Sequence, residues 1–141
     1  MQEYGPDALL SELLRRRDLG EDAARPEAVA ARRSKGGRTA RENIADLVDE
    51  GSFLEYGRLA TAAQEQRLSA EELLSQTPAD GLIGGLGRIN GDLFGDASGC
   101  AVLSYDYLVM AGTQGIRGHH KTDRLLDVVE QSVGLVMPAD T

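Results

Sequence analysis

The residues best suited to chemistry lie between Tyr105 and Arg124, where a glycine-containing loop leads into a predicted helix. The first turns of this helix carry five basic side chains, Arg117, His119, His120, Lys121 and Arg124. Glycines let backbone N–H groups approach a ligand closely, and a helix N-terminus adds unpaired donors and partial positive charge. The stretch therefore predicts a site for a phosphate or another anion, with His120 and Lys121 best placed to meet it. The same pattern also fits an ordinary strand-to-helix turn with a solvated basic face.

Other catalytic chemistry finds little support among the residue types. His119 and His120 are adjacent, so on a helix they point about 100° apart and are poor joint ligands for one metal ion. Ser98 and Ser104 lack the Gly-x-Ser-x-Gly context of a hydrolase nucleophile. Cys100 is the only cysteine and lies beside apolar residues, so we expect it to be buried as a small hydrophobe. The sequence thus offers no catalytic side chain and no metal site.

Composition sets the class of protein. The 141 residues fit one domain, and a formal charge of −8 argues against general nucleic-acid binding, which needs a basic footprint. No apolar run approaches the roughly 20 residues that a membrane-spanning helix requires. Glu3 and Asp7 stand where a signal peptide would be basic, so we expect a cytoplasmic protein.

The first half of the chain is predicted to be mainly helical. Leucines at helical spacing indicate a short amphipathic helix that ends near Gly20, and Pro26 suits the first turn of a second helix. Two capping boxes, Thr39 to Glu42 and Ser69 to Glu72, each predict the start of a further helix. Between them, residues 53–56 alternate as a short strand would. The leucines of the first helix are Leu9, Leu10, Leu13 and Leu14.

The second half predicts a sheet. Residues 82–94 suggest a hairpin, because Asn90-Gly91 suits a type I′ turn. A buried strand, Ala101 to Tyr105, follows, and Asp106 at its end is expected to cap the next loop. Leu125, Val128 and Val129 then form the inward face of the helix, and Val133 to Met137 form a last strand. The order β, β, α, β implies a crossover and hence a mostly parallel or mixed α/β sheet.

Three sequence segments, taken in their order along the chain, carry a resemblance to a known family. They are Thr-Ala-Arg-Glu-Asn-Ile-Ala-Asp-Leu-Val-Asp-Glu-Gly-Ser-Phe-Leu-Glu-Tyr at 39–56, Asp-Gly-Leu-Ile-Gly-Gly-Leu-Gly-Arg-Ile-Asn-Gly at 80–91, and Ala-Gly-Thr-Gln-Gly at 111–115 with His-Lys-Thr-Asp-Arg at 120–124. Together they resemble the N-terminal part of the carboxyltransferase component of biotin-dependent acyl-CoA carboxylases. The resemblance covers about residues 30–136.

The resemblance implies a crotonase-like fold of ββα units, incomplete here and preceded by N-terminal helices. Residues 1–30 would be a helical extension or the remnant of a junction, and residues 31–141 the N-terminal portion of the carboxyltransferase domain. In this family an acyl-CoA enolate attacks CO2 released from carboxybiotin, and backbone N–H groups in two oxyanion holes stabilise the charge. The CoA side would be lined by Gly112, Gly115, His120, Lys121 and Arg124.

The implied partners follow from the same chemistry. Biotin would be carried by a partner domain or subunit, and biotin carboxyl carrier and biotin carboxylase domains or subunits would work with this chain in an oligomer. No metal, nucleic acid or membrane is implied.

The sequence departs from the family near its C-terminus. Family members follow the strand that corresponds to residues 134–137 with a glycine-rich loop that forms an oxyanion hole, whereas this sequence continues with Pro138-Ala139-Asp140-Thr141. We therefore expect a segment that is catalytically incomplete as an isolated chain. The alternative is a non-catalytic CoA-binding or assembly module that pairs with another carboxylase polypeptide. An unrelated small α/β phosphate binder would require the three-block match to be accidental.

Overall fold

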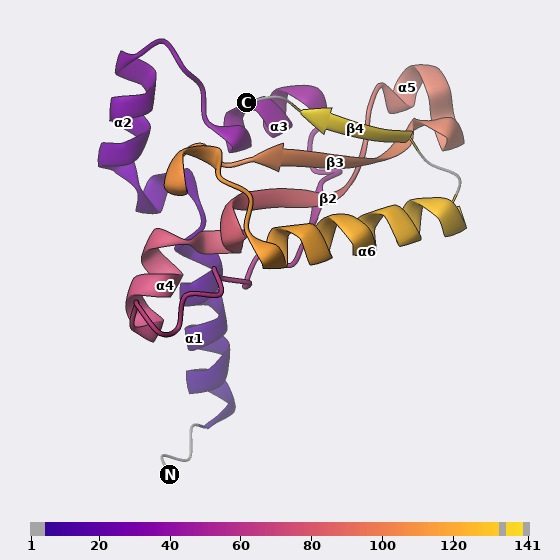
Figure 1. Ribbon diagram of the computed structural model, residues 1–141. Coiled ribbons are helices and arrows are strands. Elements are labelled where there is room, and N and C mark those ends of the chain that lie inside the picture. The colour runs from indigo at the N-terminus through magenta and orange to yellow at the C-terminus, as the bar shows by residue number, and fades with distance from the viewer. Residues whose placement is uncertain (1–4, 133–134, 140–141) are drawn as a thin grey trace.

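A four-stranded mixed sheet forms the centre of the protein, whose computed structural model describes residues 5–132 and 135–139 (Figure 1). The strands lie in the order β1 (Leu54–Tyr56), β2 (Leu82–Arg88), β3 (Gly99–Tyr105) and β4 (Leu135–Ala139). β2 runs antiparallel to β1 and β3, whereas β3 and β4 are parallel. Parallel neighbours need a crossover, which helix α6 (Ile116–Ser132) provides. The predicted mixed sheet is confirmed, and the predicted start of the last strand, at 133–134, lies outside the described residues.

Helices α3 (Ala40–Leu47) and α6 cover opposite faces of this sheet (Figure 1). Successive side chains of a strand point to opposite faces, so the neighbours Leu82 and Ile83 belong to different hydrophobic clusters. α6 buries Gly118 and Leu125, and Val128 and Val129 are half-buried. The buried residues are Ala40, Ile44, Ile83, Cys100 and Val102 in the cluster below α3, and Leu82, Leu103 and Leu125 in the cluster below α6.

The N-terminal segment contains two helices, α1 (Pro6–Asp18) and α2 (Pro26–Ser34), with a 3-10 turn, η1 (Asp22–Ala24), between them. Both helices have proline in their first turn, as predicted for α2. α1 buries none of its residues, and its N-terminal end points away from the sheet (Figure 1). Within residues 5–132 and 135–139, no helix is both long enough and apolar enough to cross a membrane.

Both capping boxes form as predicted. In α3 the Thr39 side chain accepts a hydrogen bond from the Glu42 amide, and the Glu42 carboxylate accepts one from the Thr39 amide. The pair Ser69 and Glu72 does the same for α4 (Ala70–Gln76). These reciprocal bonds satisfy amides that no helical carbonyl can reach, which explains where each helix begins.

The predicted hairpin at Asn90-Gly91 is wrong. Asn90 has the expected left-handed conformation, with φ 52°, but it starts a short helix, α5 (Gly91–Phe94), which a 3-10 turn, η3 (Gly95–Ser98), extends. The next strand along the chain that pairs with β2 is therefore β3, and not residues 92–94. The cause is tertiary, because the Asp49 carboxylate accepts hydrogen bonds from the amides of Asn90 (3.0 Å) and Gly91 (2.7 Å) and so turns the chain.

Candidate functional site

The N-terminus of α6 holds an anion that the protein itself supplies. The Asp80 carboxylate accepts a hydrogen bond from the Gly118 amide (2.8 Å), which is one of the first-turn donors of the helix. Gly115 makes this approach possible, because a Cβ there would overlap both carboxylate oxygens of Asp80. Asp80 is only 2% exposed. The helix start that the sequence suggested for an external phosphate is thus occupied, in part, from within.

One turn further along, α6 forms the wall of a basic cavity. A hollow of about 450 Å³ is lined by Tyr56, Gly57, His120, Lys121 and Arg124. Three of the predicted site residues come together here because positions 120, 121 and 124 share one side of a helix. His120 and Arg124 are exposed residues, and the atoms that line the hollow are mainly apolar.

The two predicted glycines lie elsewhere. Gly112 belongs to the 3-10 turn η4 (Met110–Gly112), with φ 77°, and Gly115 packs against Asp80. Neither glycine lines the basic cavity. Their visible role is in the path of the loop that leads into α6.

Lys121 turns its ammonium group inward. Its Nζ donates hydrogen bonds to the carbonyls of Ala79 (2.6 Å) and Leu82. Its methylene chain crosses Gly57, where a Cβ would overlap it. Burial lowers the pKa of Lys121 to about 8, although the nearby Glu55 carboxylate acts in the opposite direction. Sequence reasoning missed this arrangement, because the two carbonyls lie about 40 residues away in the chain.

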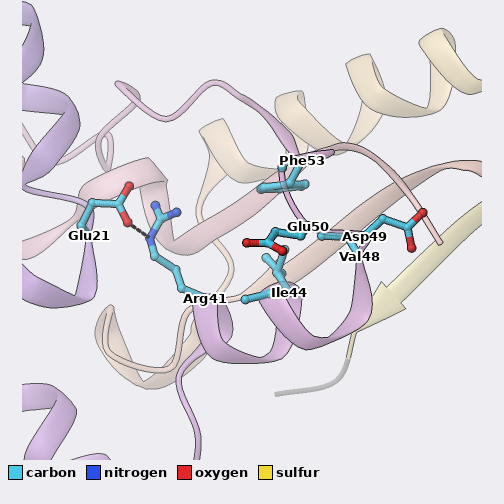
Figure 2. A pocket seen from close by; sticks show the side chains of 9 residues that line it. Glu21, Arg41, Ile44, Val48, Asp49, Glu50 and Phe53 are labelled. Atoms are coloured by element: carbon cyan, nitrogen blue, oxygen red, sulfur yellow. Dashed lines mark ion pairs between the residues drawn. The ribbon is translucent and has the colours of Figure 1, made fainter. Parts of the chain in front are cut away.

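A second and larger cavity lies beside α3 and contains about 640 Å³. Figure 2 shows Ile44, Val48 and Phe53 along it, with Arg41 paired to Glu21 (3.6 Å) at one end. Its remaining charged lining residues are the carboxylates Asp49 and Glu50. Arg41 is also paired with the buried Glu55 (2.9 Å). Because acidic groups outnumber basic ones here, this cavity is less suited to a phosphorylated ligand than the smaller basic one.

The remaining candidates for chemistry have structural roles. Cys100 is buried as predicted, and burial raises the pKa of its thiol. Asp106 caps the following loop by accepting a hydrogen bond from the Leu108 amide (3.0 Å), also as predicted. The described part of the chain contains no group of His, Cys, Asp and Glu side chains able to hold a metal ion.

Comparison with known proteins assigns the fold to a family. The sequence matches the family model of the carboxyl transferase domain over residues 31–138. A beta4 subunit of a biotin-dependent long-chain acyl-CoA carboxylase from Mycobacterium tuberculosis is 34% identical over 118 residues. That match covers 84% of this chain and 20% of the relative. The chain belongs to the carboxyl transferase domain family.

Solved structures agree with this family and with the predicted crotonase-like fold. A single-chain, multi-domain long-chain acyl-CoA carboxylase superposes with a TM-score of 0.90 at 50% identity. The superposition covers 98% of this chain and 14% of that one. Transcarboxylase 12S, at 22% identity and a TM-score of 0.78, shares the fold. The chain thus spans about a fifth or less of the length of these carboxylases.

Proposed function

We propose that this chain supplies the CoA-facing, N-terminal part of a carboxyltransferase, which moves a carboxyl group from carboxybiotin to an acyl-CoA. The observation that carries the proposal is the basic cavity, which is lined by His120, Arg124 and the methylene chain of Lys121 in a chain of net charge −8. A basic hollow in an acidic protein concentrates anionic ligands. CoA, with its phosphate groups, is such a ligand.

Each exposed side chain of the cavity has a chemical role in this proposal. The Arg124 guanidinium suits bidentate contact with a phosphate, and His120 adds a ring nitrogen that can donate a hydrogen bond. The Tyr56 ring offers a flat apolar surface on which adenine can stack. Gly112 and Gly115 shape the loop that precedes this wall. The task of these residues is to bind and orient the thioester.

The wider assignment follows from the relatives. A biotin-dependent relative implies that the biotin arrives on a partner domain or subunit, together with biotin carboxylase and carboxyl carrier functions. We infer an oligomeric assembly and a cytoplasmic setting, in which acyl-CoA is available.

Calorimetric titration of the purified chain with CoA tests the proposal. We expect Arg124→Met and His120→Ala each to weaken CoA binding by about tenfold, the loss of one charge-assisted contact. Arg67→Met is the matched control, because Arg67 is also exposed but lies outside the cavity. Binding that is absent in the wild type, or that Arg67→Met reduces as much as Arg124→Met, would refute the CoA site.

A second function, as a non-catalytic assembly module, is favoured by α1. Its leucines Leu9, Leu10 and Leu13 are 58%, 54% and 47% exposed. An apolar stripe of this kind is typical of a helix that packs against another protein surface. We expect Leu10→Glu to abolish co-purification with a co-expressed biotin carboxylase polypeptide if α1 has the assembly role. Leu93→Glu is the control and should leave co-purification unchanged, because Leu93 is 78% exposed but lies on α5.

A further inference from the structure

We propose that Lys121 is a positioning residue, which fastens helix α6 to the left-handed turn at Ala79–Gly81 and thereby fixes the helix face that carries His120 and Arg124. The inference rests on the proposed CoA site, because it assigns Lys121 a different role from that of its two neighbours in the cavity wall.

The turn that Lys121 holds is strained. Ala79, Asp80 and Gly81 all have positive φ, at 56°, 51° and 70°. For the two non-glycine residues this conformation is unfavourable and persists only where surrounding contacts impose it. The turn is buried as well, since Ala79 is 3% and Asp80 2% exposed.

Contacts from Lys121 help to hold this turn in its unfavourable conformation. The Nζ of Lys121 donates to the carbonyl of Ala79, the first residue of the turn, and to that of Leu82, which follows the turn. The same turn presents the Asp80 carboxylate to the Gly118 amide of α6. Turn and helix are therefore joined by contacts in both directions, from Lys121 to the turn and from Asp80 to the helix.

A direct ligand role fits this geometry less well. A Lys ammonium has three donors, and two of them already meet buried carbonyls. Only the methylene chain remains as cavity wall, where it crosses Gly57. The charged groups that face Lys121 are Glu55 from β1, Asp80 from the turn and Arg41 from α3. His120 and Arg124, by contrast, are exposed.

The sequence offers a direct experiment, because Lys35 and Lys121 are its only lysines. NMR of the chain carrying lysine labelled at Cε and Nζ gives one signal for each, with the exposed Lys35 as internal reference. We expect the Lys121 signal to titrate well below the ordinary lysine pKa of 10.5. Addition of CoA should shift the His120 ring signals and leave the Lys121 titration in place.

Variants test the positioning role. Lys121→Met should accelerate amide exchange at Gly118 and weaken CoA binding about tenfold, within the usual range for coupled sites. Lys121→Gln keeps two N–H donors without the charge, so it should recover part of that affinity. Lys35→Met is the control and should change neither quantity.

The outcomes separate this proposal from the CoA site. A Lys121 titration at the ordinary lysine pKa of 10.5, a Lys121 titration raised by CoA, or unchanged Gly118 exchange in Lys121→Met would each overturn the positioning role. If the wild type binds no CoA, the proposed function fails, whereas the titration and the amide exchange, both measured without CoA, still decide whether Lys121 fastens α6. If Lys121→Met does not fold, Gly118 exchange in Lys121→Gln decides it.

Discussion

The contact between Gly115 and Asp80 depends on the absence of a side chain at one position. We expect Gly115→Ala to lower the free energy of unfolding by about 1 to 3 kcal/mol, the usual cost of overpacking a buried contact. The added Cβ would overlap the Asp80 carboxylate, which is buried and bound to the Gly118 amide. Urea denaturation measures the change.

Gly99→Ala is the matched control for this substitution. Gly99 has φ −68°, and the space that a Cβ would enter there is open to a distance of 4 Å, so alanine fits without overlap. Equal stabilities for the two variants would show that the loop before α6 yields easily and does not hold Asp80 in place.

Lys121 should make stability depend on alkaline pH. Burial lowers its pKa to about 8 from the ordinary 10.5, so the unfolded chain binds this proton more tightly than the folded chain. The free energy of unfolding then rises with pH between about 8 and 10.5, and this contribution is lost as the pH falls through 8. Urea denaturation at several pH values measures the free energy of unfolding of the wild type and of Lys121→Met. The difference between the two proteins isolates the contribution of Lys121. A flat difference across this window would contradict the shifted pKa.

The two capping boxes are alike in sequence but not in surroundings. Thr39 is 2% exposed, and its hydroxyl also donates to the Asp22 carboxylate, whereas Ser69 is exposed. We expect Thr39→Ala to cost about 2 kcal/mol and Ser69→Ala about 0.5 to 1 kcal/mol, because only the first also removes a hydrogen bond from a buried hydroxyl to the half-buried Asp22 carboxylate. Thermal and urea denaturation of the two variants give the comparison. A larger loss for Ser69→Ala would contradict it.

The elements that the sequence predicted correctly are those whose signals are local. A capping box contains both partners within four residues, so the starts of α3 and α4 follow from the sequence. The prediction of a hairpin at Asn90-Gly91 failed because the conformation there depends on Asp49, which lies on a distant segment. Short-range patterns thus give element starts, while pairings that need a distant partner require the structure.

The same distinction applies to the candidate site. Helical spacing was enough to place His120, Lys121 and Arg124 on one side of α6. It could not show that the Lys121 ammonium points to the carbonyls of Ala79 and Leu82, or that Asp80 occupies the helix start. The family resemblance supplied the fold, but the roles of single residues depend on contacts across the whole chain.

At the scale of the whole molecule, one buried ion pair joins the N-terminal helices to the sheet. Arg25 contacts Asp106 at 2.7 Å, with side chains 11% and 3% exposed. Arg25 also donates to the Gly20 carbonyl (3.3 Å), and Asp106 caps the loop that leads toward α6. The pair therefore links the segment before α2, the end of β3 and the approach to the basic cavity.

The sequence predicts that residues 1–30 are a helical extension or the remnant of a junction. Removing Arg25 tests whether this extension is separable from the sheet. Arg25→Met leaves the Asp106 carboxylate buried without its partner, so we expect a loss of about 3 to 5 kcal/mol. Arg16→Met is the control, because Arg16 pairs with Glu12 on the surface of α1, where solvent screening leaves such a pair with little effect on stability. The measurement is urea denaturation, with amide exchange of β3 followed in parallel. A loss for Arg25→Met as small as that for Arg16→Met would mean that this ion pair contributes little to holding the extension on the sheet, whereas a large loss with faster exchange in β3 would make the N-terminal helices part of the carboxyl transferase fold.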